Sequence, residues 1–519
     1  MRISSVVGRA VQINGPGLAT NYLGRRRTWK QFGERVARIA AALVELGVEP
    51  GDRVAMLGLN SDWYLEYFFA VPWAGAVFVP INTRLAAPEI VHWLNDSEAS
   101  VLLVDDHFVD MLPSFRDQIE NLGPVIHVGS GAPPEGLLSY EALLAEASPI
   151  EPRDNGGDDL AGLFYTGGTT GRSKGVMLSH RNLLLNPLQF SAEAGFRASS
   201  NYLHAAPMFH LANGAATFAV TSVAGGSTMI TAFDPLEVLR AIEREKVTIT
   251  MLIPTMINMV VNHPEAAGSD LSSLLDILYG ASPMPEAVIA KAMETIPQTR
   301  FMQAYGQTES SPVLTVMGHE YHVTSGPMAG KIRSAGRAVP GVEMRIVDAD
   351  DNEVPRGTVG EICGRGDNVM QGYWKQPGLT AQTLRNGWLH TGDGGYMDED
   401  GFVFLVDRVK DMIISGGENV YSAEVEDAIY QHPAVAECAV IGIPHEKWGE
   451  QVHAVVRCKD GEALTDEGLM AHCKQLIAGY KCPRSVDFVI EPLPLSGAGK
   501  ILKTELRKPF WQGTDRAIN

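Results

Sequence analysis

Hydrophobic runs alternate with helical patterns along roughly the first 340 residues. Strand-like apolar runs cover 53–59, 77–81, 100–106 and 248–253, and helical patterns cover 88–97, 141–147 and 235–247. A further stretch, ending at Ala76, reads as an amphipathic helix. Because parallel strands need crossover connections, usually helices, this alternation predicts an α/β protein with largely parallel sheet.

The pattern changes beyond residue 340. Strand patterns within 342–366 are separated by polar turns, which predicts antiparallel hairpins. A smaller pattern follows, with helices over 422–432 and 467–477 and strands over 436–443 and 451–458. A chain of 519 residues is too long for one compact core. We therefore expect a multi-lobed N-terminal domain at 1–408, with two α/β subdomains and a small β subdomain. A hinge at 409–411 and a mobile α+β C-terminal domain at 412–519 complete this prediction.

Charge and cysteine content narrow the function classes. The 42 basic and 61 acidic side chains give a formal net charge of −19, which disfavours non-specific binding to nucleic acid or anionic lipid. We interpret the basic run 25–27 as a solvated face without function. The cysteines form no CxxC pair, which favours reduced thiols and a cytoplasmic location. They are Cys363, Cys438, Cys458, Cys473 and Cys482.

Neither a signal peptide nor a transmembrane segment is expected. The N-terminal residues lack a sufficiently long apolar core. The stretch 202–233 lacks Asp, Glu, Lys and Arg, but polar residues such as His204 interrupt it. It therefore favours a buried core and pocket wall over a membrane span.

The segment 164–175, FYTGGTTGRSKG, has the composition of an anion-binding loop. Glycines let backbone N–H groups approach an anion, hydroxyls add donors, and a lysine adds positive charge. Its candidate ligand-binding residues are Thr166, Gly167, Gly168, Thr169, Thr170, Gly171 and Lys174. A Walker A loop is excluded because Lys174 lies between Ser173 and Gly175. The pattern predicts a polyphosphate-binding loop, with a simple mobile turn as the alternative.

Four further segments follow in order along the chain: YGQTES (305–310), WLHTGD (388–393), DRVKDMIISGGENVY (407–421) and LSGAGKILKTELR (495–507). With the glycine-rich loop, they resemble signatures of the adenylate-forming superfamily of acyl-CoA synthetases, peptide-synthetase adenylation domains and luciferases. The resemblance spans nearly the whole chain. It implies that a carboxylic acid attacks the α-phosphate of ATP to give acyl-AMP, from which a thiol displaces AMP. ATP, Mg²⁺ and coenzyme A are the implied cofactors, and a homodimer is the familial expectation.

The resemblance also implies roles for individual residues. Glu309 and Thr308 match the magnesium-side positions, and Lys500 matches the lysine that drives adenylation by neutralising phosphate charge. Asp393 and Arg408 match the ribose-binding pair. The adenine-side positions are Gly280, Ala281 and Ser282, and Tyr305 and Gly306 are further cofactor-binding candidates. Lys410 matches the hinge, and Gly416 and Gly417 lie beside the implied channel for the CoA pantetheine.

The acyl pocket is less clearly marked. His210, in PMFHL, resembles a gate beside the acyl and CoA route, although a satisfied core histidine is the alternative. Its expected neighbours are Phe209, Asn213 and Gly214. Gly306 stands where acetate-specific relatives carry a bulky aromatic residue, which indicates an open pocket floor, while Ala304 narrows one wall. A one-methyl difference contributes only about 1–3 kcal/mol to discrimination and does not name a substrate.

The sequence therefore predicts an AMP-forming acyl-CoA synthetase, an acid–thiol ligase acting on a small carboxylic acid. A medium- or long-chain fatty acid is the first interpretation, and an aryl or hydroxycinnamic acid is the alternative. An adenylation enzyme that loads a separate carrier protein remains open. So does a non-catalytic nucleotide-binding regulator, although the presence of Lys174, Glu309 and Lys500 disfavours it. CoA is preferred as acceptor because 407–421 most resembles acyl-CoA synthetases and no carrier domain follows.

Overall fold

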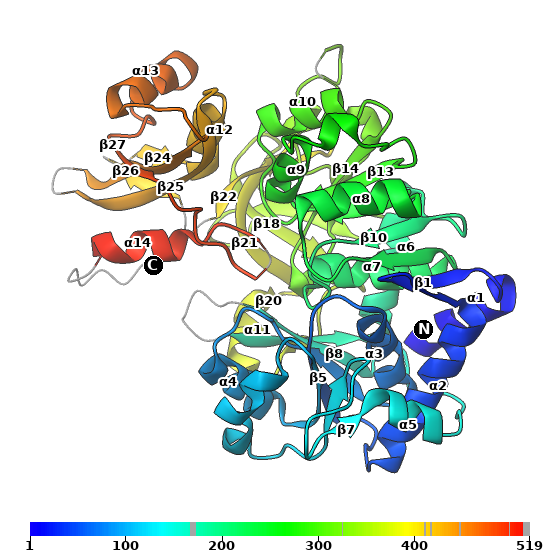
Figure 1. Cartoon of the computed structure of the whole chain (residues 1–519). Helices are drawn as coiled ribbons and strands as arrows, with labels where there is room; N and C mark the ends of the chain where they lie inside the picture. Colours follow the sequence, from blue (N-terminus) through cyan, green and yellow to red (C-terminus); the bar gives the residue numbers. More distant parts are fainter. Residues whose placement is uncertain are drawn as a thin grey trace.

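The computed structural model describes residues 1–166, 173–323, 325–408, 412–415, 418–445, 448–497 and 499–511. Figure 1 shows a large multi-lobed body, coloured from blue to yellow along the chain, and a smaller orange-to-red unit beside it. This is the α/β architecture that the sequence predicts, with a large N-terminal part and a small C-terminal part. The expected hinge at 409–411 lies outside the described residues, so the domain boundaries stay a prediction.

The first sheet of the body has the strand order β19-β9-β8-β4-β3-β5-β6-β7. Its strands are β3 (Arg53–Leu57), β4 (Val77–Pro80), β5 (Ala99–Asp105), β6 (Val125–Val128), β7 (Leu138–Ser139), β8 (Leu160–Thr166), β9 (Lys174–Ser179) and β19 (Gly372–Tyr373). Strands β3 to β7 are parallel to their neighbours, as predicted, and β8 and β9 form an antiparallel pair. The predicted phosphate loop connects this pair, and its residues 167–172 lie outside the described chain.

The second sheet has the order β16-β15-β14-β13-β12-β10-β11-β1-β2. Its strands are β1 (Leu18–Tyr22), β2 (Arg25–Thr28), β10 (Asn201–His204), β11 (Gly226–Met229), β12 (Ile249–Leu252), β13 (Asp276–Gly280), β14 (Arg300–Tyr305), β15 (Thr315–Met317) and β16 (Arg337–Ala338). The run from β1 through β11, β10, β12 and β13 to β14 is parallel. The carboxyl ends of β13 and β14 therefore lie side by side, and both carry predicted nucleotide residues.

A small antiparallel sheet follows, as the hairpin pattern predicts. Its strands are β17 (Glu343–Val347), β18 (Gly360–Arg365), β20 (Leu384–Arg385), β21 (Trp388–Met397) and β22 (Val403–Arg408). Strand β21 pairs with β18, β20 and β22, so it is central to this sheet. The same strand carries Asp393 near its middle.

The small C-terminal unit has a sheet and a hydrophobic core of its own. Its strands are β23 (Ile413–Ser415), β24 (Glu418–Val420), β25 (Val435–His445), β26 (Gly449–Cys458) and β27 (Ser485–Val489). Its helices are α12 (Ser422–Tyr430), α13 (Asp466–Leu476) and α14 (Lys503–Trp511). The core residues, such as Ile413, Val425 and Val440, pack with one another rather than with the body. A separate hydrophobic core is the mark of a separately folded domain.

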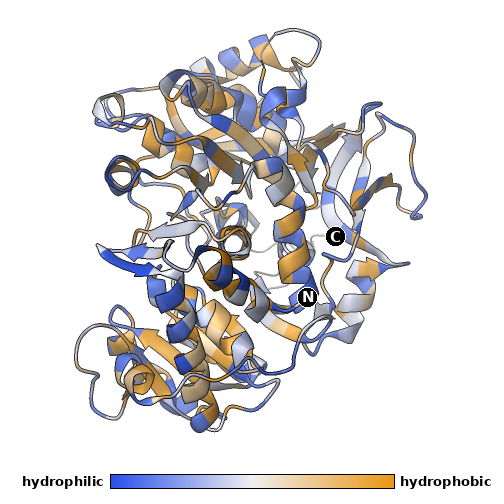
Figure 2. Cartoon of the chain, turned by 90° about the vertical axis from the view of Figure 1, so that its right-hand side faces the viewer, coloured by the Kyte–Doolittle hydropathy of each residue, from blue (hydrophilic) through white to orange (hydrophobic). Residues whose placement is uncertain are grey.

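The helices of the body lie against its sheets, and many of them carry hydrophobic and hydrophilic residues in alternating bands (Figure 2). They are α1 (Ile3–Asn14), α2 (Trp29–Glu45), α3 (Asp62–Trp73), α4 (Ala87–Ser97), α5 (Tyr140–Glu146), α6 (His180–Ala194), α7 (Leu211–Ser222), α8 (Pro235–Glu245), α9 (Pro254–Val261), α10 (Glu286–Thr295) and α11 (Pro377–Thr383). Among the residues described, no helix is long and apolar enough to cross a membrane.

Helix α3 differs from its sequence prediction. It is buried along nearly its whole length rather than amphipathic. Phe68 contacts Phe78 of β4 and Phe218 of α7 with ring centroids 5.1 and 5.9 Å apart, so the helix is enclosed by elements on several sides. A helix enclosed in this way has no solvent-exposed polar face, and its two acidic residues, Asp62 and Glu66, are buried.

The basic run at 25–27 also differs from its prediction as a solvated face. Arg27 on β2 is only 10% exposed at its side chain and pairs with Asp62 of α3. Arg25 donates to both Asp62 oxygens, at 2.8 and 2.5 Å. Arg26 alone of the three points mainly to solvent, because side chains alternate along a strand. The run therefore neutralises buried carboxylates.

Candidate active site

Three polar side chains from separate segments meet beside the ends of the predicted phosphate loop. Lys174 begins β9, Tyr373 ends β19, and Glu309 lies on a short 3-10 turn, Thr308–Ser310. The Tyr373 hydroxyl donates to Glu309 Oε1 at 2.7 Å, and Lys174 Nζ donates to the Tyr373 oxygen at 2.7 Å. Lys174 Nζ also lies 3.6 Å from Glu309 Oε1. We call Lys174, Glu309 and Tyr373 the phosphate-side cluster.

Burial and charge define this cluster further. Glu309 is 7% exposed, so its carboxylate depends on these two partners for compensation. Burial, followed by the Glu309 charge, holds the pKa of Tyr373 well above its usual value, so its hydroxyl stays a donor. Both contacts to Glu309 use Oε1. The cluster is therefore a fixed carboxylate with a cation beside it.

Two threonines extend the cluster toward the loop. Thr308 precedes Glu309 on the same turn and is buried. Thr166 ends β8, and its buried Oγ1 has no hydrogen-bond partner among the residues described. A buried hydroxyl without a partner is costly and is often explained by a ligand or ion. The remaining loop residues predicted here, Gly167, Gly168, Thr169, Thr170 and Gly171, lie outside the described chain.

The predicted ribose side is also assembled. The Tyr305 hydroxyl donates to Asp393 Oδ2 at 2.8 Å, which joins the end of β14 to the middle of β21. Asp393 pairs with Arg408 in the β21–β22 ladder. The backbone N–H of Asp393 donates to Thr391 Oγ1 at 3.1 Å and helps to fix the backbone of β21 at this point. Three residues distant in sequence are thus brought together by two sheets.

The adenine-side segment lies at the carboxyl ends of β13 and β14. Gly280 pairs with Ala304, and a Cβ at Gly280 would lie 2.1 Å from the Ala304 carbonyl oxygen. Ala281 follows with a φ of 67°, a left-handed conformation that redirects the chain toward Ser282. A Cβ at Gly306 would lie 2.0 Å from the Pro312 oxygen. Close backbone packing therefore requires both glycines, independently of any open pocket floor.

The Lys500 loop of the small unit is docked against the body. Within the loop, Ser496 N–H donates to the Lys500 carbonyl at 2.7 Å, and Lys500 N–H donates to Ser496 Oγ at 3.1 Å. Arg84 of the body donates to the Ser496 carbonyl at 2.8 Å. A Cβ at Gly499 would lie 2.3 Å from Ile253 Cδ1, so glycine permits the close approach.

His210 lies near the docked lysine. It is the N-terminal cap of α7, and Ala212 N–H donates to its Nδ1 at 3.3 Å. Burial, and then the Lys500 charge, lower the pKa of His210 to about 4. The imidazole is therefore neutral near pH 7. Residues from the two units, 290 positions apart in sequence number, converge at this point.

Three other predicted pocket residues are close to His210 in the chain, and Ala304 lies on β14. Phe209 is nearly buried. Asn213 is fully buried, accepts from the Tyr202 hydroxyl at 2.9 Å and donates to the Ala206 carbonyl at 2.6 Å. Its amide thus supports the core. A Cβ at Gly214 would lie 3.2 Å from the Met208 oxygen, whereas Ala304 is partly exposed.

Two residues in this region carry no sequence signal that we used. Tyr373 connects Lys174 to Glu309 from a segment outside the motifs, and Arg84 holds the Lys500 loop from a turn after β4. Conversely, the predicted hinge and CoA-channel residues, Lys410, Gly416 and Gly417, lie outside the described chain. The structure thus adds two positions, and the hinge, CoA-channel and loop residues outside the described chain stay predictions.

Comparison with known proteins identifies the class. Residues 10–374 match the family model described as AMP-binding enzyme, and residues 424–500 match the AMP-binding enzyme C-terminal domain. The chain therefore belongs to the AMP-binding, adenylate-forming enzyme family. Within it, the chain is an acid–thiol ligase of the AMP-forming acyl-CoA synthetase type. The family resemblance predicted from the motifs is confirmed.

Individual relatives cover nearly the whole chain. A feruloyl-CoA synthase of Amycolatopsis sp is 41% identical over 505 residues, covering 97% of this chain and 98% of the relative. A medium/long-chain-fatty-acid–CoA ligase of Mycobacterium tuberculosis is 36% identical over 515 residues, covering 96% and 88%. Among solved structures, an anthranilate CoA ligase in complex with anthranoyl-AMP has a TM-score of 0.91 at 27% identity, covering 98% and 97%.

Proposed function

We propose that this enzyme is a CoA ligase for an aromatic acid of the hydroxycinnamate class. In the first half-reaction the acid and ATP form acyl-AMP and pyrophosphate, and in the second CoA thiolate displaces AMP. The observation that carries the substrate class is the 41% identity to feruloyl-CoA synthase over 97% of the chain. Fatty-acid ligases are similar at 34–36% identity, so a fatty acid is the second candidate.

The phosphate-side cluster supports the first half-reaction. A carboxylate has no good leaving group, and adenylation supplies one. Negative charge develops on the α-phosphate during this step. We assign Lys174 to the polyphosphate, together with the loop that begins at Thr166. Because the described contacts of Glu309 use Oε1, Oε2 is the oxygen we assign to Mg²⁺.

The donor set fits magnesium. Mg²⁺ prefers hard oxygen ligands and usually binds through one or two carboxylates plus substrate phosphates. Glu309 offers a buried carboxylate, Thr308 is its neighbour in the chain, and Thr166 pairs with Lys174 in the β8–β9 ladder. When bound, the ion would neutralise charge on the ATP phosphates. These three residues are our proposal for the magnesium side of the site.

The docked Lys500 loop supports the assignment of this conformation to adenylation. An ammonium group held in place stabilises developing phosphate charge without reorganisation at the moment of reaction. Asp393, Tyr305 and Arg408 are assigned to the AMP ribose, and Gly280, Ala281 and Ser282 to the adenine. We assign His210, with Phe209, to the border between the acid and the CoA route. The neutral His210 ring beside Lys500 supports this assignment.

The test is a CoA-dependent AMP-release assay with purified enzyme over a matched acid panel. Ferulate, coumarate and cinnamate are compared with octanoate and palmitate, and pyrophosphate exchange is followed in parallel. We expect kcat/KM to be highest for a hydroxycinnamate, with a CoA thioester as product. A higher value for a fatty acid would overturn the substrate class but keep the reaction. Acylation of a carrier protein without any CoA thioester would overturn CoA as acceptor. Absence of exchange with every acid would favour a non-catalytic regulator.

A further inference from the structure

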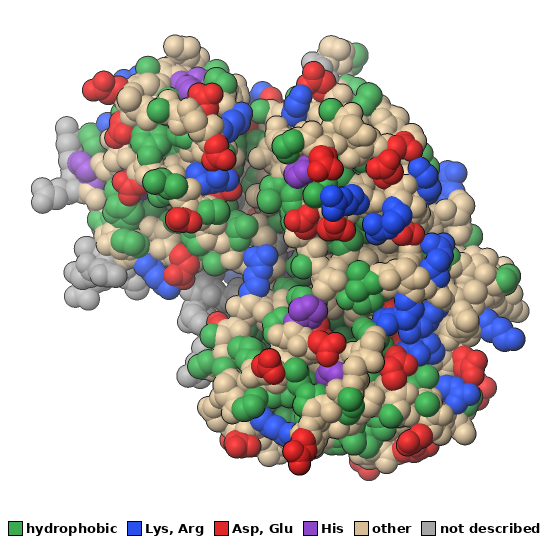
Figure 3. All heavy atoms as spheres, viewed as in Figure 1, with side chains coloured by type: hydrophobic (Ala, Val, Ile, Leu, Met, Phe, Trp, Pro, Cys, Tyr) green, Lys and Arg blue, Asp and Glu red, His purple; other side chains and the backbone are tan. Residues whose placement is uncertain are grey.

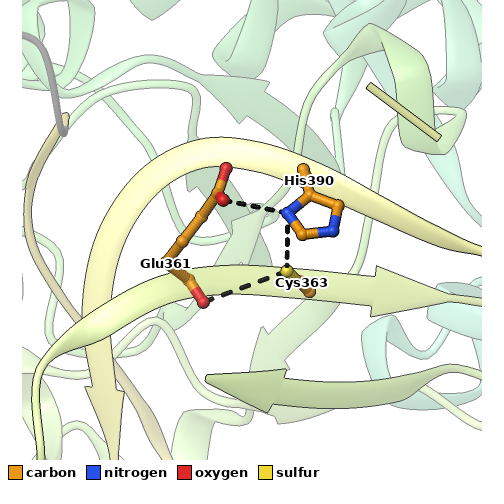
Figure 4. Close-up of side chains that lie close together, drawn as sticks. All are labelled: Glu361, Cys363 and His390. Atoms are coloured by element: carbon orange, nitrogen blue, oxygen red, sulfur yellow. Dashed lines mark hydrogen bonds and ion pairs between the residues drawn. The ribbon is translucent and has the colours of Figure 1, made fainter. Parts of the chain in front are cut away.

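Three side chains with metal-binding atoms meet in the small sheet, away from the phosphate-side cluster (Figure 4). Glu361 and Cys363 lie on β18, and His390 lies on the neighbouring strand β21. His390 Nδ1 is 2.9 Å from Glu361 Oε2 and 3.3 Å from Cys363 Sγ. Cys363 and His390 are buried, and the three candidate ligand atoms lie within 4.8 Å of one another. We call these residues the β18–β21 cluster.

The contacts around His390 Nδ1 are mutually inconsistent as hydrogen bonds. Arg385 Nη2 lies 2.7 Å from the same nitrogen and can only donate, whereas the Glu361 carboxylate can only accept. A ring nitrogen carries either one N–H or one lone pair. Whichever tautomer is chosen, at least one of these close contacts is left unsatisfied. No protonation state of His390 Nδ1 therefore satisfies both the Arg385 donor and the Glu361 acceptor.

The other ring nitrogen gives an independent observation. His390 Nε2 is buried and has no hydrogen-bond partner among the residues described. Its nearest acidic neighbour is Asp351, with Oδ1 3.8 Å away. In metal sites, a histidine that binds through one nitrogen generally directs its other N–H to a carboxylate. Binding through Nδ1 would place the proton on Nε2, facing Asp351.

We propose that Glu361, Cys363 and His390 bind a divalent cation of the zinc class. The ligands would be Glu361 Oε2, Cys363 Sγ as thiolate, and His390 Nδ1, with the thiol proton released to solvent. A carboxylate, a thiolate and an imidazole form a mixed donor set of the kind that binds zinc, whereas magnesium and calcium prefer oxygen alone. The site is distinct from the proposed magnesium position at Glu309.

The guanidinium of Arg385 is the competing cation. It contacts His390 Nδ1, and its Nη2 also lies 2.9 Å from Asp351 Oδ1 and 3.4 Å from Glu361 Oε2. The positive charge of Arg385 therefore lies beside the same side chains that a bound cation would contact. The Arg385 side chain is 43% exposed, so it can turn outward into solvent when the ion binds.

The position of this site connects it to the nucleotide side. Glu361 uses its second oxygen, Oε1, to accept from Gly392 N–H at 3.0 Å, directly before Asp393. The Thr391 hydroxyl donates to the Ile362 carbonyl at 2.7 Å on the same strand pair. Metal binding should therefore restrict the part of β21 that carries Asp393.

The experiment uses the full-length enzyme, freed of metal by a chelator and titrated with Co²⁺. We expect one equivalent to bind and to give the thiolate-to-cobalt absorption band, and Zn²⁺ to displace it. The band should be lost in Cys363→Ser and kept in the matched control Cys458→Ser, whose sulfur lies on β26 of the small unit. Absence of a stoichiometric band in the wild type, or its persistence in Cys363→Ser, would overturn the proposal.

A second variant leaves all three ligands in place and so does not depend on the folding of Cys363→Ser. Arg385→Gln removes the competing charge, and we expect it to increase Co²⁺ affinity roughly tenfold or more. An unchanged affinity in a folded Arg385→Gln protein would contradict the assigned position. X-ray absorption of the zinc-loaded wild type should show one sulfur ligand, and a shell of oxygen and nitrogen alone would also reject the site.

Discussion

The phosphate-side cluster and the Lys500 loop serve one proposed site but are held in place differently. Lys174 and Tyr373 lie on strands of one sheet, and Glu309 is buried against them. The Lys500 loop comes from a unit with its own core, and a hydrogen bond from Arg84 helps to hold it on the body. Figure 3 shows a furrow between the small unit and the body on one face. If the proposed function holds, adenylation depends on docking of the Lys500 loop, whereas the phosphate-side cluster is fixed within the body.

The largest expected effect is a difference between the body and the small unit in how their stability responds to acid. Three buried histidines of the body have lowered pKa values because of burial: about 4 for His180, about 3 for His204 and about 4 for His322. An unfolded histidine titrates near 6.5, so the unfolded state binds more protons between about pH 6.5 and pH 4. Stability should fall as pH falls through this window, by about 2 kcal/mol per histidine at pH 5.

Hydrogen exchange at pH 7 and pH 5, corrected for intrinsic rates, measures this effect separately in each region. We expect protection of the most stable amides to fall more in the body, with three such histidines, than in the small unit, where burial lowers the pKa of His453 alone among the buried histidines described there. Equal losses in both, or unchanged protection in the body, would contradict the expected dependence on these histidines.

The next prediction tests whether Lys500 acts only in the first half-reaction. Lys500→Ala should reduce pyrophosphate exchange by roughly a hundredfold or more, since loss of one preorganised donor costs about 3 kcal/mol. Thioester formation from supplied acyl-AMP should remain close to wild type. Equal losses in the two half-reactions would show that Lys500 is not confined to adenylation.

Removal of a single hydroxyl tests the fixed region. Tyr373→Phe deletes the donor to Glu309 and the acceptor of Lys174, and bonds to charged groups are worth about 1.5–3 kcal/mol. We expect kcat/KM for adenylation to fall about tenfold or more. The control is Tyr321→Phe, whose hydroxyl accepts from Arg337 elsewhere on the body. A similar decrease in both variants would argue against a specific role for Tyr373.

The smallest effect concerns docking. Arg84→Ala removes an exposed hydrogen bond to the Ser496 carbonyl, so we expect adenylation to slow about twofold to fivefold. Thioester formation from supplied acyl-AMP should not change. Arg240→Ala on α8, which removes only an i,i+3 pair with Glu237, is the matched control. Equal slowing of both half-reactions would reject the docking role.

Much of the architecture and many candidate nucleotide-binding residues could be predicted, because the sequence patterns that indicate them lie within short segments of the chain. The alternation of strands and helices predicts the parallel sheets, and the motifs name Lys174, Glu309 and Asp393 directly. Tyr373 could not be predicted in the same way, because its contact with Glu309 joins positions 64 apart and tyrosine is ordinary in a strand. Arg84 likewise depends on how two separately folded units meet.

Most differences between the sequence predictions and the structure concern polar residues that are buried. The sequence shows that Arg27 is basic but not that Asp62 of α3 faces it. It shows that Asn213 is polar, whereas Tyr202 and Ala206 use both ends of its amide within the core. Each case depends on a partner brought close by tertiary packing, which hydrophobic periodicity does not report.

The thiols of this protein provide a natural means of attaching a spectroscopic probe. Four of the five cysteines are buried, and Cys458 on β26 is partly exposed. A thiol-reactive fluorophore should therefore label the small unit first, since access controls reactivity. With a second dye introduced on the body, energy transfer would test whether the small unit changes position during turnover, with no cysteine removed.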